Sequence, residues 1–134
     1  MQQETVTLVQ SSWSKVLPIA PQAAALFYQN LFAADPSLQA LFKGNMEEQG
    51  KKLMQMIGAA VGKLNDLPTL VPILQNLGQR HAGYGVQDAH YQTVGGALLK
   101  TLEQGLGGDF TTEVRAAWTE VYGIIAATMI AASK

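Results

Sequence analysis

The stretch LFYQNLFAADPSLQALF, residues 26–42, decides the fold, because it combines two helical segments with one unexpected aromatic residue. Phe27 and Leu31 lie four residues apart, which is the spacing of one helix face. Asp35 is followed by proline, a pair typical of an N-cap and the first turn of a helix. Tyr28 is less expected in a buried helix, since its hydroxyl is costly to bury without a hydrogen-bond partner. The stretch therefore predicts two helical elements and a phenol that needs a partner.

Apolar residues recur every three or four positions along nearly the whole chain, which is the pattern of amphipathic helices. Pro18 is expected to end the first helix. Pro72 is expected in the first turn of its helix, because a proline further in would break the hydrogen-bond ladder. We expect Asp88 to cap one of the later helices, and either Thr111 or Thr112 to cap the last one.

No alternating run indicates a strand, and no linker or repeat divides the chain. The sequence therefore predicts an all-α fold with six to seven helices in a single domain, residues 1–134. The expected core-facing stripes are Val6, Val9, Trp13 and Val16; Leu26, Phe27 and Leu31; Leu53, Met56, Ile57, Ala60, Val61 and Leu64; Leu70, Ile73, Leu74, Leu77 and His81; Tyr91, Val94, Leu98, Leu102 and Leu106; and Val114, Trp118, Val121, Ile125 and Met129.

Composition argues against several classes of function. Hydrophobic residues make up 48% and charged residues 14% of the 134 residues, so a ligand or a second copy is a candidate to cover apolar surface. The formal net charge of −1, without a basic cluster, does not fit a nucleic-acid binder. The absence of cysteine excludes disulfides and thiolate metal sites. Neither a secretory signal nor a membrane span is visible, so we expect a cytoplasmic protein.

The two histidines differ in their setting. His90 lies at an expected helix start and is predicted to be solvated. His81 follows Leu77 by four residues on a core-facing stripe, where a histidine either bonds to a backbone carbonyl or serves as a ligand. On the preceding helix, Gln49 lies one turn before Leu53 at the start of an equally apolar stripe. Two apolar faces, each with one polar group, are suited to line a flat cavity.

From about residue 8 to about residue 129 the chain resembles a globin, specifically the single-domain bacterial globins close to the neuroglobin, flavohaemoglobin and Hell's Gate globin group. The resemblance rests on the order and spacing of its landmarks, each of which is weak alone. These landmarks are Trp13 and the segments LFYQNLFAADPSLQALF, QGKKLMQMIGAAV, LGQRHAGYGV, HYQTVGGALLKTLEQGLG and FTTEVRAAWTEVYG.

This resemblance implies a haem b (iron protoporphyrin IX) cofactor and assigns roles to particular residues. His81 matches the proximal ligand of the iron, and Phe42 matches the aromatic residue that stacks on the haem. Tyr28 and Gln49 match the distal positions that face a bound gas. Lys52 matches a lysine that meets a haem propionate, although a solvated lysine is an equal alternative. The remaining residues implied to line the haem are Leu53, Leu77, Val86, Tyr91 and Val94, of which Tyr91 could also hydrogen-bond near the proximal histidine.

The resemblance implies a globin that reversibly binds oxygen and other diatomic gases with high affinity, since two donors would stabilise a polar bound ligand. Gln49 is a poor metal ligand, so the sixth coordination position is expected to stay open or water-filled. An alternative is a nitric oxide dioxygenase, which would need a separate reductase as its electron donor. A third class, the non-haem sensors on this fold, is disfavoured by His81.

One departure from the flavohaemoglobin pattern bears on chemistry. The last acid of the chain is Glu120, so the glutamate expected late in the final helix is missing, and a strong electronic push on the iron is not expected. The expected partners are therefore diatomic gases and, for the alternative function, a separate reductase, with no nucleic acid and no membrane. The expected oligomeric state is a monomer or a weak homodimer.

Overall fold

The computed structural model describes residues 2–42 and 44–134, and in these residues it contains six α-helices, three short 3₁₀ helices and no strand. The all-α prediction and the predicted number of helices are confirmed. The α-helices are α1 (Gln3–Val16), α2 (Ala20–Ala34), α3 (Met46–Gly62), α4 (Leu67–Gly83), α5 (Asp88–Leu106) and α6 (Thr112–Ala132), and the 3₁₀ helices are Leu17–Ile19, Pro36–Leu41 and Gly107–Asp109.

Several helix ends follow from local sequence. Pro18 lies in the 3₁₀ turn directly after α1, as expected for a residue that ends a helix. The Asp35 carboxylate accepts a hydrogen bond from the backbone N–H of Ser37 at 3.1 Å, which confirms it as the cap of Pro36–Leu41. The Thr111 hydroxyl accepts from the N–H of Val114 at 3.2 Å, so Thr111 is the cap of α6.

Three predictions about the later helix starts are wrong. α4 begins at Leu67, so Pro68 occupies its first turn and Pro72 lies inside the helix, where its missing N–H removes one hydrogen bond. Gln87, not Asp88, is the N-cap residue of α5. His90, which was predicted to be solvated, is half-buried. Its Nδ1 accepts a hydrogen bond from the backbone N–H of Gln87 at 2.9 Å, so its side chain takes part in capping the start of α5.

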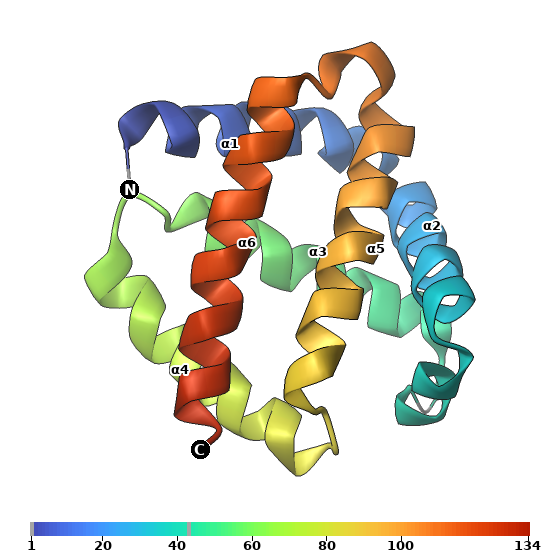
Figure 1. Ribbon diagram of the computed structural model, residues 1–134. Coiled ribbons are helices and arrows are strands. Elements are labelled where there is room, and N and C mark those ends of the chain that lie inside the picture. The colour runs from blue at the N-terminus through green and yellow to red at the C-terminus, as the bar shows by residue number, and fades with distance from the viewer. Residues whose placement is uncertain (1, 43) are drawn as a thin grey trace.

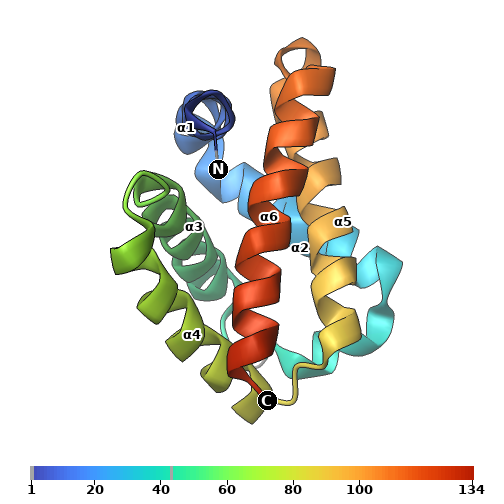
Figure 2. The ribbon, with the colours of Figure 1, turned by 60° about the vertical axis from the view of Figure 1, so that its left-hand side comes forward.

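The helices are arranged so that α1 and α3 cross the pair formed by α5 and α6 (Figure 1). Figure 1 shows α5 and α6 running antiparallel in front, with α1 and α3 crossing behind them. Figure 2 shows α3 and α4 together on one side of α6. The closest packed pairs are α4 with α6, α2 with α5, α1 with α6 and α2 with α3. Among the described residues, α3 and α4 pack against these other helices and not closely against each other.

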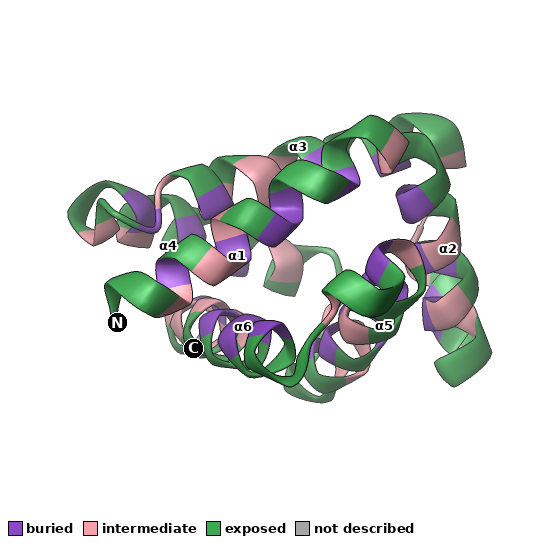
Figure 3. Cartoon of the chain, turned by 90° about the horizontal axis from the view of Figure 1, so that it is seen from above, coloured by how far each residue is buried: buried purple, intermediate pink, exposed green. Residues whose placement is uncertain are grey.

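Most of the predicted core is buried. Figure 3 shows buried residues on the sides of α1, α5 and α6 that face other helices. The largest fully buried side chains are Leu31, Leu70, Leu102, Val9 and Val121. Ile73 is an exception, because 42% of its surface is exposed although its spacing placed it on the core-facing stripe of α4. The reason is that α4 packs mainly on α6, so the side of the helix that carries Ile73 is not covered.

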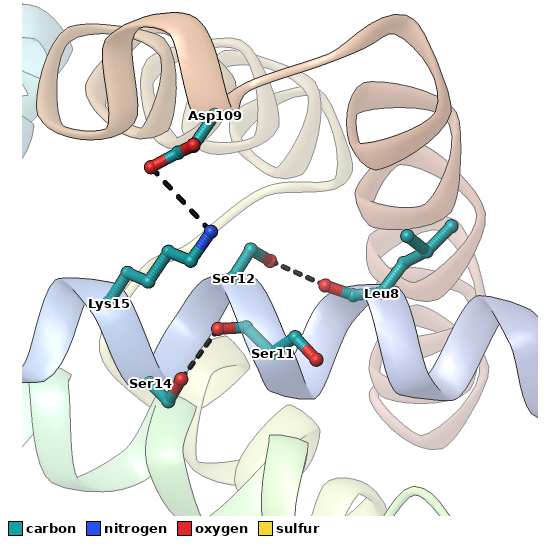
Figure 4. Close-up of polar contacts among 6 residues, drawn as sticks. All are labelled: Leu8, Ser11, Ser12, Ser14, Lys15 and Asp109. Carbon is teal, nitrogen blue, oxygen red and sulfur yellow. Dashed lines mark hydrogen bonds and ion pairs between the residues drawn. The ribbon is translucent and has the colours of Figure 1, made fainter.

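A buried polar contact joins α1 to α6. The indole N–H of Trp118 donates to the Ser12 hydroxyl at 2.7 Å. The Ser12 hydroxyl in turn donates to the Leu8 carbonyl at 2.7 Å (Figure 4). The rings of Trp13 and Trp118 lie 6.0 Å apart beside it. Because both Trp118 and Ser12 are buried, this pairing satisfies groups that would otherwise be costly to desolvate.

Over the residues that the structure describes, none of the helices combines the length and the hydropathy needed to cross a lipid bilayer.

Candidate functional site

His81 lies in the last turn of α4 and is half-buried. Its Nδ1 lies 2.7 Å from the carbonyl oxygen of Leu77, one turn earlier in the same helix. A carbonyl oxygen can only accept a hydrogen bond, so Nδ1 carries the proton, and Nε2 of the neutral ring keeps its lone pair. A histidine held in this way at one nitrogen is oriented to bind a metal with the other. The hydrogen bond of His81 to a backbone carbonyl is therefore compatible with a role of His81 as a metal ligand.

Two tyrosine rings flank the His81 imidazole. The Tyr91 ring of α5 lies 6.5 Å from it, with the ring planes 30° apart, and the Tyr84 ring lies 6.2 Å from it. Tyr91 is buried, whereas 67% of Tyr84 is exposed. The N–H of Val86 donates to the His81 carbonyl at 3.0 Å, so the chain folds back over the end of α4 before α5 begins. No hydrogen bond joins Tyr91 to the His81 ring among the described residues.

A glycine fixes where α4 lies. Gly78 is buried, and a Cβ at this position would overlap the backbone carbonyl of Met129 on α6. Only a residue without a side chain allows the two helix backbones to come this close. Because His81 follows Gly78 by three residues, this contact also sets the position of the imidazole relative to α6.

Tyr28 is the centre of an aromatic cluster on the opposite side of the fold. Its ring centroid lies 5.3 Å from that of Phe42, 5.4 Å from that of Phe27 and 5.9 Å from that of Phe32. The residue is only 8% exposed, and burial raises the pKa of its phenol to about 12. The phenol is therefore a neutral donor at ordinary pH. Among the described residues, no protein atom hydrogen-bonds to its hydroxyl.

A close helix crossing brings Tyr28 and Gln49 onto neighbouring elements. Gly50 is buried where α3 crosses α2, and a Cβ there would lie 3.0 Å from the Ala24 Cβ and 3.9 Å from the Tyr28 ring. Gln49, directly before it, is half-buried in the first part of α3. The two predicted distal residues therefore come from helices in direct contact.

The other predicted lining residues form a partly covered apolar surface. Lys52 is exposed on α3, and no ion pair involving it is present in the described chain. Tyr91 is buried, and the remaining predicted positions are half-buried and packed against the core: Phe42, Leu53, Leu77, Val86 and Val94. The structure brings Phe42 to Tyr28, and Leu77 and Tyr91 to His81.

A pocket of about 460 Å³ opens between α3 and α4. Its lining residues are Met56, Pro72, Ile73, Asn76, Leu77 and Arg80. Leu77 is both a lining residue and the hydrogen-bond partner of His81, so the pocket adjoins the imidazole. Met56 and Leu77 are half-buried, whereas the other lining residues are exposed, so the pocket is an open groove that includes Leu77 from the predicted haem-lining set.

The residues present fit a haem. The imidazole offers a free Nε2, the apolar residues of α3 and α4 are incompletely covered, and the Tyr28 hydroxyl lacks a protein partner among the described residues. Arg80 adds a cation at the pocket, where the carboxylates of a porphyrin rim would be favoured. The fold and this set of groups thus define a helical protein of the haem-binding class.

The family follows from comparison with known proteins. The globin family model matches residues 25–129, and the chain belongs to the globin family. It is 33% identical to the neuroglobin of Dissostichus mawsoni over 136 aligned positions, which cover 91% of this chain and 86% of that protein. The neuroglobins of Chaenocephalus aceratus and Danio rerio are 33% and 32% identical over the same shares.

A solved structure shows the same architecture. It is an engineered carbene transferase derived from a candidate nitric oxide dioxygenase of Rhodothermus marinus, and it matches with a TM-score of 0.88 at 26% identity. The match covers 99% of this chain and 93% of that one. The predicted resemblance to the globins, including single-domain bacterial ones, is confirmed.

Sequence reasoning missed two close contacts of helical glycines, that of Gly78 with the Met129 backbone and that of Gly95 with the Tyr122 ring. Both glycines lie inside helices, where glycine costs about 0.5–1 kcal/mol relative to alanine. A glycine inside a predicted helix was therefore the available sign that a backbone or a ring of another helix comes close at that position. Tyr122 follows Trp118 by four residues and so shares the predicted face of α6, but helical spacing does not reveal the partner of its hydroxyl.

Proposed function

We propose that this globin binds haem b through Nε2 of His81 and reversibly binds oxygen and other diatomic gases with high affinity. The observation that carries the proposal is the 2.7 Å contact between Nδ1 of His81 and the Leu77 carbonyl, which leaves Nε2 free. Membership of the globin family supports the haem, and the half-buried apolar residues of α3 and α4 support its place.

Haem supplies a ferrous iron with one coordination position available to a gas. The residues of the chain would orient the haem, exclude water and provide hydrogen-bond donors. His81 holds the group from the side of α4, and its Nδ1–H bond to the Leu77 carbonyl restrains the ring at that atom. Phe42 and Leu53 exclude water from the opposite side, where both are half-buried against the core. A dry pocket strengthens each hydrogen bond to a polar ligand.

Tyr28 and Gln49 are proposed as the donors to the gas. Burial keeps the Tyr28 phenol protonated, so it can donate, and the Gln49 amide lies on the adjoining helix. Two donors worth about 1–2 kcal/mol each would slow oxygen release by one to three orders of magnitude. Carbon monoxide is less polar when bound and would gain less. High oxygen affinity with slow release suits sensing, scavenging or storage better than bulk delivery.

Gln49 also bears on the sixth coordination position. An amide is a much weaker ligand than an imidazole, so we propose that this position stays open or holds water. Lys52 is exposed, which is compatible either with a partner on the haem rim or with solvation.

The second candidate function is nitric oxide dioxygenase, and it is favoured by the similarity to the Rhodothermus marinus protein. In this reaction nitric oxide would combine with the oxygen that the pocket holds and leave as nitrate, and the haem would supply the one electron that the reaction consumes. A separate reductase would return that electron. Tyr28 suits this role too, because the donor that retains oxygen also keeps it in place for the incoming nitric oxide.

Absorption spectra of the ferric, ferrous and oxygenated protein, with oxygen release rates, test the first proposal. A Soret band, a stable oxygenated form and slow release are the expected results. Protein that shows no Soret band after haem is added would contradict it. Rapid mixing of the oxygenated form with nitric oxide tests the second, and it requires stoichiometric nitrate together with measurable reduction by a cellular reductase.

A further inference from the structure

Tyr122 of α6 makes a hydrogen bond that the proposed function has not used. Its phenol donates to the backbone carbonyl of Tyr91, in the first turns of α5, at 2.6 Å. Burial, followed by the nearby Tyr91 phenol, raises the pKa of Tyr122, so the group remains a donor at any ordinary pH. The bond therefore ties the beginning of α5 to the middle of α6.

Gly95 makes room for this contact. A Cβ on Gly95 would lie only 2.7 Å from Cε2 of Tyr122 and 3.0 Å from its Cδ2. Gly95 follows Tyr91 by one helical turn, so the ring and the hydroxyl of Tyr122 contact the same part of α5. The neighbouring Gly96 is different, since nothing lies within 4 Å of the position its Cβ would take.

The residue that Tyr122 anchors is also the one that flanks His81. The buried Tyr91 ring lies 6.5 Å from the His81 ring. The hydrogen bond to the Leu77 carbonyl restrains the imidazole at Nδ1 only. The remaining rotation of the ring has to be limited by the side chains next to it. Of the two flanking rings, Tyr91 is the one fixed by packing.

We propose that Tyr122 is a positioning residue for the imidazole of His81: by anchoring the first turns of α5, it fixes the Tyr91 ring that limits the rotation of His81. This inference rests on the proposed role of His81 as iron ligand. The Tyr122 phenol acts through the Tyr91 backbone carbonyl and not through the imidazole itself.

The test compares Tyr122→Phe, Gly95→Ala and Gly96→Ala in the haem-loaded ferrous protein. Tyr122→Phe removes only the hydroxyl, whereas Gly95→Ala displaces the ring. Resonance Raman spectroscopy reports the iron–histidine stretching band, and amide hydrogen exchange reports the first turns of α5. We expect the band to shift or broaden and exchange to quicken in Tyr122→Phe and Gly95→Ala, and both to stay at the wild-type values in Gly96→Ala.

A band identical in wild type and Tyr122→Phe would overturn the positioning role, even if exchange or the melting temperature changed, because those changes alone indicate a structural bond. This reading does not depend on Gly95→Ala, so a failure of that variant to fold leaves the test intact. Absence of any iron–histidine band in the haem-loaded wild type would instead refute the assignment of His81 in the proposed function. The two failures are thus distinguishable.

Discussion

Nδ1 of His81 and the carbonyl oxygen of Leu77 lie 2.7 Å apart within the last turns of α4. The bond stays inside one helix, so it forms whenever the end of α4 is formed. It fixes the tautomer of the imidazole, since the carbonyl requires the proton on Nδ1. α4 in turn is positioned by the contact of Gly78 with Met129 of α6. The tautomer of the imidazole is therefore set within one helix, whereas the position of the ring in space depends on packing between helices.

Replacing His81 by glycine should abolish stable haem binding, because no other described histidine lies near the pocket between α3 and α4. Free imidazole added to His81→Gly should restore the Soret band, since it can occupy the vacated space. The matched control is His90→Ala, which removes the bond to the Gln87 N–H and should cost about 1 kcal/mol of stability without loss of haem. Tight haem retention by His81→Gly without imidazole would remove His81 from the proposed site.

Tyr28→Phe should speed oxygen dissociation by about 5- to 30-fold, since a donor in a dry pocket contributes about 1–2 kcal/mol and about 1.4 kcal/mol is a factor of ten. Stopped-flow displacement of oxygen measures this rate. Carbon monoxide release should change less, because that ligand is less polar. Tyr84→Phe is the control, because 67% of Tyr84 is exposed and its hydroxyl is not needed in the pocket. An unchanged oxygen rate in Tyr28→Phe would show that the phenol does not face the gas.

Tyr28 also predicts a loss of stability in alkali. Its pKa is about 12 in the folded chain and near 10.0 when exposed, because burial disfavours the phenolate. Between these values the unfolded state releases the proton and the folded state keeps it, so the free energy of unfolding falls as pH rises from about 10 to 12. Urea unfolding at pH 9 and at pH 11 measures this loss.

The loss should be smaller in Tyr28→Phe than in wild type. The contributions of Tyr91 and Tyr122, whose pKa values are also raised by burial, are present in both proteins and cancel in the comparison. Equal losses in the two proteins would mean that Tyr28 titrates as an exposed phenol.

Gly78→Ala should destabilise the protein by roughly 1–3 kcal/mol or more, since the added methyl group overlaps the Met129 carbonyl and must push α4 away from α6. Haem should dissociate faster, because His81 moves with α4. Gly83→Ala is the matched control in the same helix, where no atom lies within 4 Å of the added carbon and φ is ordinary. Chemical denaturation and haem transfer to an acceptor globin measure the two effects; equal stability of both variants would contradict the close helix contact.

Local signals predicted the helices well and their exact starts less well. Asp35 and Thr111 act as caps because a side-chain oxygen needs only the next two or three N–H groups, all of which are close in sequence. The predictions for Pro72 and Asp88 were wrong because a neighbouring residue takes each place: Pro68 lies in the first turn of α4, and Gln87 is the N-cap residue of α5. A helix start among such competitors is selected by the packing of the whole helix.

The sequence by itself determined an all-α chain with helices near their observed places, the apolar stripes, and an imidazole four residues after the carbonyl that orients it, because each depends on residues within one or two helical turns. Tertiary structure alone decided that α3 and α4 stay apart, that Gly50, Gly78 and Gly95 are crossing points, and that Tyr122 reaches the Tyr91 carbonyl. Helical periodicity gives a residue its face but not its partner, and partners are chosen when the faces of several helices fit together.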